Sequence, residues 1–447
     1  FIVALGRFWF LRGHFSGWDW WLSATLSKVT ADGAGVAILK AKALLERGML
    51  ALYVGDRPRA ADVGKESLSL FEAVNDQWGR AAAMVIAGAW EPNQVAQLEE
   101  AVALARQVDD AWLTAWCLQW LGQTVGRTMY DSERAEVLGA ESLALAQQTG
   151  DAWLIGWALM SLGQSGRSAH DVGRADGYFR ESLAHYRHMR DRLGMAWALG
   201  GLGLAALEQG KYIEARAYEE ERLTIETNLG NKRGMIATLR QLSRVALESG
   251  DLEQARMLGE RSLLLARQTG EVQSIAWSLL PLARLELIWG NAEGAIRLLE
   301  ECLAYRLEAR ASGETVDALV MLAWAASGVG AYGRAREHLM EAVNVASDVG
   351  YAAGICAAIE AMAGVVAMVG QMDQAAQLMG AAAARRVTSG VGMHPSDRAL
   401  TAAALTAMHN DLGTDGFETA WRVGGSLTLE DVMEMVQGIE YIERSSS

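Results

Sequence analysis

The segment Asp191–Gly230, DRLGMAWALGGLGLAALEQGKYIEARAYEEERLTIETNLG, decides the fold of this chain. Its apolar residues follow helical spacing as far as Gly210, and a second run of helical spacing begins near Tyr212 and ends at Gly230. Each run is about 17 residues, which makes an α-helix of roughly 25 Å at 1.5 Å per residue. The segment therefore predicts two antiparallel helices joined by a glycine turn.

This helix pair recurs with a period of forty residues. The strictest positions are alanines of the second helix: Ala175, Ala215, Ala255, Ala295, Ala335 and Ala375. Large apolar residues of the first helix keep the same spacing: Leu162, Leu202, Leu242, Leu282, Leu322 and Met362. Glycines, which favour the left-handed conformation that ends a helix, recur at the turns: Gly210, Gly250, Gly290, Gly330 and Gly370 within repeats, and Gly230, Gly270 and Gly350 between them. The period predicts an all-α fold, a right-handed superhelical solenoid of antiparallel helix pairs.

The period also predicts how the chain is divided. Repeat units extend over residues 36–380, with eight or nine units in all. Residues 1–35 are rich in aromatic side chains and are expected to form a helical cap or a segment that docks onto a neighbouring domain. Residues 381–447 are expected to form a C-terminal helical cap and tail, in which Thr428 and Asp431 make a capping box.

Composition excludes some classes of partner. The formal charge of −14 and the pI near 5.1 oppose nucleic-acid binding, because a polyanion is held by clustered Lys and Arg. Three cysteines without a C-x-x-C motif indicate reduced thiols and a cytoplasmic setting. The most apolar window, Tyr351–Gly370, contains only Glu360 as a charge, but it keeps the repeat register and is rich in Ala and Gly. It is therefore expected to be a buried helix of the array and not a membrane span.

Sequence motifs of catalysis are absent. The chain contains no G-x-x-x-x-G-K-[ST] phosphate loop, no H-E-x-x-H and no G-x-S-x-G. His185 and His188 share a helix face without a nearby acidic or thiol ligand. Paired Asp and Glu residues are expected on solvated helix faces with partners four residues away. The chain is therefore predicted to be no enzyme and to hold neither a cofactor nor a metal.

Several residues carry a resemblance to a known family. Leu202-Gly203, Ala215 and the aromatic Phe179, four residues after Ala175, resemble the tetratricopeptide signature, although this repeat is longer and lacks its closing proline. The longer form resembles the sensor regions of bacterial STAND-class signal-transduction ATPases, including LuxR-type transcriptional regulators. Residues 7–22, RFWFLRGHFSGWDWWL, resemble the start of those regions, and AAQLMGAAAARR, HPSDRA and FETAWRVGGSLTLEDVMEMV resemble their closing segments.

The resemblance implies a binding surface. In tetratricopeptide arrays the first helix of each pair lines the concave groove, and the matching positions here are Trp157, Gln164, Arg167, Trp197, Arg240, Arg244, Trp277, Arg284 and Trp324. Trp and Arg are common anchors of binding sites. Two alternatives stay open: a tryptophan ladder that packs between adjacent hairpins, and arginines that are simply solvated.

The resemblance also implies a function, that of a non-catalytic sensor. The groove would bind a protein, a peptide or a small-molecule inducer and would control an upstream ATPase domain of the same polypeptide, with oligomerisation on activation. No direct contact with nucleic acid or membrane is expected. The alternative is a free-standing adaptor or scaffold that holds partner peptides or proteins without a switch.

Overall fold

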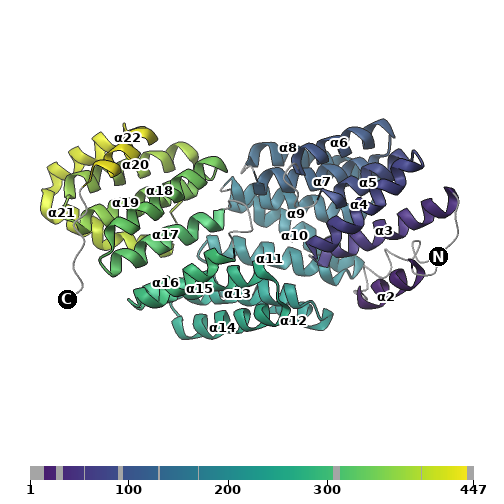
Figure 1. The fold of residues 1–447 in the computed structure, drawn as a ribbon, viewed down its shortest axis with the longest axis horizontal. Helices are drawn as coiled ribbons and strands as arrows, with labels where there is room; N and C mark the ends of the chain where they lie inside the picture. The colour runs from purple at the N-terminus through teal and green to yellow at the C-terminus, as the bar shows by residue number, and fades with distance from the viewer. Residues whose placement is uncertain are drawn as a thin grey trace. The chain divides into compact units, whose positions relative to one another are not determined.

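The described part of the protein is entirely helical. The computed structural model describes residues 15–26, 34–54, 56–88, 94–128, 131–169, 171–305, 313–393 and 395–439, and every regular element in these ranges is an α-helix (Figure 1). Helices that follow one another pack as antiparallel neighbours, as in α7 with α8, α9 with α10, and α11 with α12. The predicted all-α solenoid of helix pairs is confirmed.

The fold divides between Thr238 and Leu239 into two compact units. Unit 1 contains α2 (Phe15–Leu26), α3 (Ala34–Val54), α4 (Arg57–Ala73), α5 (Gln77–Ala87), α6 (Gln94–Gln107), α7 (Ala111–Thr128), α8 (Ser132–Thr149), α9 (Ala152–Ser168), α10 (Val172–Met189), α11 (Arg192–Glu208) and α12 (Tyr212–Leu229). The division falls within α13 (Lys232–Glu248). Unit 2 contains α14 (Leu252–Thr269), α15 (Val272–Ile288), α16 (Ala292–Ala304), α17 (Gly313–Gly328), α18 (Tyr332–Asp348), α19 (Ala352–Met368), α20 (Met372–Ser389), α21 (Pro395–Gly424) and α22 (Leu429–Gly438).

The predicted turn chemistry is present in both units. All eight glycines of the forty-residue period have positive φ, from 65° at Gly230 to 87° at Gly370. The residue that opens the next helix is often an Asp: Asp191 accepts a hydrogen bond from the backbone N–H of Gly194 at 3.1 Å, and Asp251 accepts one from Gln254 at 3.2 Å. Such caps satisfy donors that a helix leaves free at its first turn.

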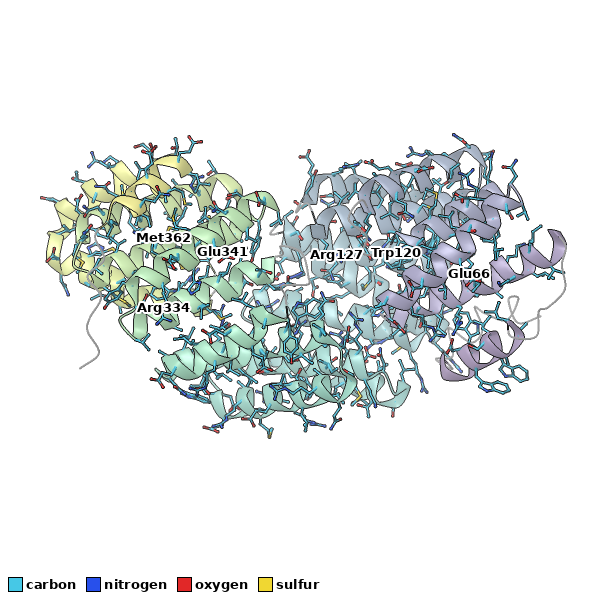
Figure 2. All side chains as sticks on the ribbon, in the orientation of Figure 1. Glu66, Trp120, Arg127, Arg334, Glu341 and Met362 are labelled. Carbon is cyan, nitrogen blue, oxygen red and sulfur yellow. The ribbon has the colours of Figure 1, made fainter. Side chains whose placement is uncertain are left out.

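The periodic alanines form the contact between the two helices of each pair. All six are completely buried. In unit 2 the hydroxyl of Ser243, on α13, donates to the backbone oxygen of Ala255 on α14 at 2.6 Å. The side chain of the first helix thus reaches the backbone of the second helix at the alanine, whose own side chain is only a methyl group. The periodic large apolar residues are buried as well, including Met362 of α19 (Figure 2).

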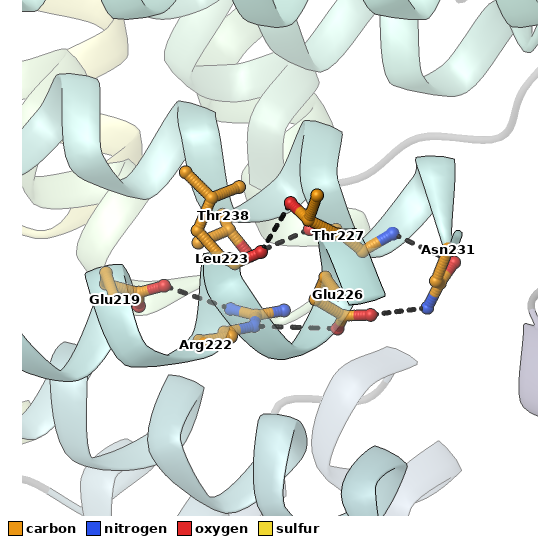
Figure 3. Close-up of polar contacts among 8 residues, drawn as sticks. Glu219, Arg222, Leu223, Glu226, Thr227, Asn231 and Thr238 are labelled. Carbon is orange, nitrogen blue, oxygen red and sulfur yellow. Dashed lines mark hydrogen bonds and ion pairs between the residues drawn. The ribbon is translucent and has the colours of Figure 1, made fainter. Parts of the chain in front are cut away.

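The second helix α12 differs from the other second helices because charged side chains occupy its buried face. Glu219 and Glu226 are each only 1% exposed. One repeat earlier, the same positions hold Phe179 and Tyr186. Arg222 lies between the two glutamates, with Nη1 3.3 Å from Glu219 Oε2 and Nε 3.9 Å from Glu226 Oε1 (Figure 3). The expectation of solvated acidic faces is wrong for this helix, although it holds for exposed pairs such as Arg256 with Glu260.

Glycines make room for these charges. A Cβ atom added to Gly203 of α11 would lie 2.6 Å from Glu219 Oε1, and one added to Gly234 of α13 would lie 2.2 Å from the carboxyl carbon of Glu226. Asn231 also donates to Glu226 Oε2 at 2.8 Å. Burial raises the pKa of Glu226, whereas Arg222 and Asn231 act in the opposite direction.

We expect Arg222→Met to destabilise the protein strongly, because it removes the cation that lies between two buried carboxylates. Such a loss typically costs about 3 kcal/mol or more of unfolding free energy. Without Arg222 the pKa of Glu226 in the folded state rises further above its unfolded value, so the loss is greatest at pH 8 and shrinks as the pH falls and the carboxyl takes up a proton. Urea denaturation at several pH values measures this.

The matched control is Arg256→Met, which removes an exposed ion pair with Glu260 and a cation–π contact with Trp289 and should cost much less than Arg222→Met. Equal losses for the two variants, or a loss at position 222 that does not depend on pH, would contradict the assignment.

The C-terminal part of unit 2 is helical. Among all the described helices, none combines the length and the hydropathy that a membrane span requires. The apolar helix α19 lies in the core, and its Glu360 pairs with Arg386 of α20 through two contacts of 2.6 and 2.8 Å. In α21 the helical path is interrupted at Gly413, and the predicted capping box of Thr428 and Asp431 opens α22.

At the N-terminal end only α2 belongs to the described residues. Trp18 is buried there, whereas Trp20 and Trp21 are 61% and 48% exposed. The predicted aromatic side chains further towards the N-terminus lie outside the described residues: Phe1, Phe8, Trp9 and Phe10.

We predict that Ala255→Leu overpacks the contact between α13 and α14 and lowers the free energy of unfolding by about 1–3 kcal/mol. Met257→Leu in the same helix is the control, because Met257 is 58% exposed and its replacement should change stability by no more than about 0.5 kcal/mol. Urea denaturation of both variants measures the difference, and an unchanged Ala255→Leu protein would show that the alanine does not set the helix contact.

Candidate binding cavity of unit 1

Unit 1 contains a cavity of about 520 Å³. Its walls come from the end of α3, from α7, α8 and α9, and from α11. The volume lies within the range of roughly 300–1,000 Å³ that is usual for small-molecule sites. The wall has an aromatic side and a polar side, and both begin on α7, where Trp120 and Arg127 lie about two turns apart (Figure 2).

Tyr53 organises the aromatic side. This residue lies near the end of α3, and its ring centre is 6.5 Å from that of Trp120, 5.7 Å from Trp157 and 5.9 Å from Trp197. Trp120 and Trp157 meet edge to face with ring centres 5.3 Å apart. The hydroxyl of Tyr53 accepts a hydrogen bond of 3.2 Å from the indole N–H of Trp116. The four rings thus come from four different helices. Each aromatic pair of this kind contributes about 0.5–1.5 kcal/mol of stabilisation, so the pairs help to hold the rings in place.

The polar side contains hydroxyl and amide groups, and several of them have hydrogen-bond donors available to a ligand. Ser161 Oγ accepts from the amide groups of both Gln119 and Gln123, the latter at 3.2 Å, so its own O–H remains to donate. Gln164 Oε1 accepts from Arg167 at 3.2 Å, which leaves the Gln164 amide N–H groups to donate. The indole N–H of Trp120 is buried without an acceptor among the described residues.

The cavity carries little charge. Arg127 is exposed at its edge and donates to Gln94 Oε1 at 3.4 Å. None of the described residues that line the cavity is an Asp, Glu or Lys. Nor do the described residues contain a cluster of His, Cys, Asp or Glu suited to a metal ion. The site therefore differs in its electrostatics from the acidic chain around it.

Three of the residues predicted from the sequence meet at this cavity. Trp157, which is 3% exposed, lines it together with Gln164 and Trp197. Trp157 also packs against Trp153, with ring centres 5.1 Å apart, so it takes part in the core as well. Arg167 does not line the cavity, because its guanidinium pairs with Glu208 at 2.8 Å and with Gln164.

The other predicted residues belong to α13 and to unit 2. The guanidinium of Arg240 lies 5.1 Å from the ring centre of Trp277, and Arg244 is half-buried on α13. Arg284 and Trp324 line a cavity of about 30 Å³. That volume admits little more than one water molecule, so it is too small for a ligand.

Sequence reasoning missed several lining residues, among them Tyr53, Trp120, Gln123, Arg127 and Ser161. For α7 and α9 a signal was present. The offset of forty-one residues that matches Trp116 to Trp157 also matches Gln123 to Gln164. Tyr53 lies outside this register, and only the folded path of α3 brings it to the tryptophans.

Comparison with known proteins agrees with this architecture. Residues 234–308 match the tetratricopeptide repeat family. The match spans most of α13 together with α14, α15 and α16. Comparison with curated protein sequences gives no match.

Many solved structures resemble the fold, including the following two. One is a Rap protein complexed with competence and sporulation factor, with 13% identity and a TM-score of 0.60, covering 78% of this chain and 96% of that one. The other is the apo form of the quorum sensor NprR from B. thuringiensis, with 15% identity and a TM-score of 0.52, covering 77% of this chain and 97% of that one. At such identities the likeness shows the shared helical-repeat fold.

We expect Tyr53→Phe to lower the free energy of unfolding by about 1 kcal/mol, because it leaves the buried indole N–H of Trp116 without its acceptor. Tyr178→Phe is the control, since the Tyr178 hydroxyl accepts hydrogen bonds from Arg174 at an exposed site and its loss should change stability by no more than about 0.5 kcal/mol. Thermal denaturation compares the two variants. Equal stability would show that the hydrogen bond to the Tyr53 hydroxyl does not stabilise the aromatic side of the cavity.

Proposed function

We propose that this chain is a non-catalytic sensor array, and that the cavity of unit 1 is its recognition site. The observation that carries the proposal is the convergence of four aromatic rings and several free donors on one preformed cavity of about 520 Å³. Its ligand is a small-molecule inducer or a segment of a protein or peptide. A site with apolar walls and a few placed polar groups is the usual form of a ligand site.

The solved neighbours support a recognition role for an array of this kind. The Rap protein was crystallised in complex with competence and sporulation factor, and NprR is described as a quorum sensor. Both share the helical-repeat fold with this chain. Recognition by a repeat array needs no catalytic group, which agrees with the sequence motifs that are missing here.

The proposal places the array in a larger cytoplasmic regulator of the STAND class. Its start and end resemble those sensor regions, so an ATPase domain would precede it in the same polypeptide. The ligand would act by binding more tightly to one state of the regulator than to the other, because only such a difference in affinity shifts an equilibrium. Release of the ATPase would then permit oligomerisation.

A thermal-shift screen of small molecules and short peptides tests the recognition site. A compound at 100 times its dissociation constant should stabilise the protein by about 2.7 kcal/mol. We expect Gln164→Ala and Trp197→Leu to abolish this stabilisation, whereas Arg284→Ala in unit 2 leaves it unchanged. Compounds that stabilise all three variants as well as the parent would place recognition outside the cavity.

The regulatory context has its own test. The coding sequence ahead of Phe1 should encode a phosphate-binding loop in the same reading frame, and the ATP hydrolysis rate of the whole polypeptide should respond to a compound from the screen. A start codon directly before Phe1 would instead favour the free-standing adaptor.

A further inference from the structure

The shape and chemistry of the unit 1 cavity narrow the class of its ligand. This step rests on the proposed function, since it takes the cavity to be the recognition site. The rings of Tyr53, Trp120, Trp157 and Trp197 all border the cavity. The ring centres of the three tryptophans lie 5.7 to 6.5 Å from that of Tyr53, and those of Trp120 and Trp157 lie 5.3 Å apart with their planes at 85°. Such a wall offers both ring faces and ring edges to a flat apolar group.

An aromatic wall by itself also suits a cation, which binds to ring faces. The polar side of this cavity decides against that ligand. None of the described lining residues is a carboxylate, and the one formal charge among them is that of Arg127. A cation would therefore meet a like charge, and the described lining residues supply no carboxylate to balance it.

Several polar groups of the wall can donate hydrogen bonds to a ligand, beside hydroxyl groups that can donate or accept. Two residues of α9 accept hydrogen bonds from partners within the protein: Ser161 Oγ from two glutamine amides, and Gln164 Oε1 from Arg167. The Ser161 O–H and the Gln164 amide N–H groups remain as donors. The indole N–H of Trp120 adds a donor that lacks an acceptor among the described residues.

We propose that the unit 1 cavity binds an aromatic carboxylate, with its ring against the wall formed by Tyr53, Trp120, Trp157 and Trp197 and its carboxylate bound by donors of Ser161, Gln164 and Arg127. A carboxylate has about four acceptor positions and no donor, so it complements this set. Arg167 acts as a positioning residue, because it can only donate and thus fixes the Gln164 amide with its oxygen towards the guanidinium.

Two sources supply this chemistry. One is a free aromatic acid, and the other is the C-terminal residue of a peptide that ends in Trp or Phe. The cavity is large enough for a free aromatic acid or for the last residue of a peptide. The choice of probes in the following experiment distinguishes these two ligands.

Titration calorimetry with matched probes tests the proposal on the whole chain. The probes are 1-naphthaleneacetate, its neutral amide, benzyltrimethylammonium, and the peptide Ala-Ala-Trp with a free or an amidated C-terminus. We expect the acid to bind about tenfold more tightly than its amide, which corresponds to one charge-assisted hydrogen bond. Tighter binding of the free-ended peptide than of 1-naphthaleneacetate assigns the site to a peptide terminus, and the reverse order assigns it to a free acid.

Two substitutions separate the carboxylate contacts from folding. Gln164→Glu replaces a donor by an acceptor of the same shape, and Arg127→Gln removes the charge at the edge. Each should weaken the acid about tenfold or more and the amide by no more than about threefold. The matched controls in unit 2 are Gln268→Glu on the exposed face of α14 and Arg284→Gln, which should leave both affinities unchanged. Circular dichroism and the Tm confirm that each variant is folded.

Other outcomes overturn the inference. They are equal binding of acid and amide, tighter binding of benzyltrimethylammonium, absence of binding by every aromatic acid at millimolar concentration, or affinities that neither substitution changes. If screening compounds still bind in the cavity in such a case, the sensor proposal stands and only the ligand class is wrong. If no compound binds there at all, both proposals fail.

Discussion

The close approach of two helices at a fully buried alanine is the constraint on which the array depends. Each of the six alanines of the forty-residue period is fully buried where the second helix packs against its neighbours, so a larger side chain there would have to displace packed atoms. This contact fixes each hairpin, and the glycine turns with positive φ fix where the hairpin begins and ends. Since the most extensive contacts join consecutive helices, an error at one alanine should mainly affect its own hairpin and the next.

A second interaction links consecutive first helices in unit 1 and thereby places the wall of the cavity. The indole N–H of Trp78 donates to Asp110 at 2.9 Å, and that of Trp112 donates to Asp151 at 3.0 Å. Asp151 also caps α9, so one carboxylate joins the start of a helix to the preceding repeat. Asp191 repeats this arrangement at α11, where burial raises its pKa to about 6 although bonds from Gly194, Leu193 and Trp153 favour its ionised form. The tryptophans of the sequence thus have two uses: some link helices, and others border the cavity.

This difference explains how much of the site was predictable. The fold follows from periodicity, because hydrophobic and glycine positions recur whatever the intervening residues are. The same register gave Trp157, Gln164 and Trp197, which the structure brings to one cavity. It could not give Tyr53, whose place depends on the path of α3 outside the strict period. The repeat register also could not distinguish a buried charged residue from a solvated one. Glu219 and Glu226 have the local sequence of an exposed helix, and they are buried because α11 and the first turns of α13 cover them in the folded chain.

The net charge of the chain does not oppose the binding of an anion in the cavity as strongly as the value of −14 suggests. Charges separated by more than about 8 Å are largely screened at physiological ionic strength. Donors of Ser161 and Gln164 act at hydrogen-bond distance and inside a partly apolar wall, where screening is weak. The local donors therefore decide the sign of the interaction inside the cavity, and the acidic surface mainly slows the approach of an anion from solution. Added salt weakens that repulsion, so the association rate of an aromatic acid should rise with ionic strength while the contacts within the cavity change little.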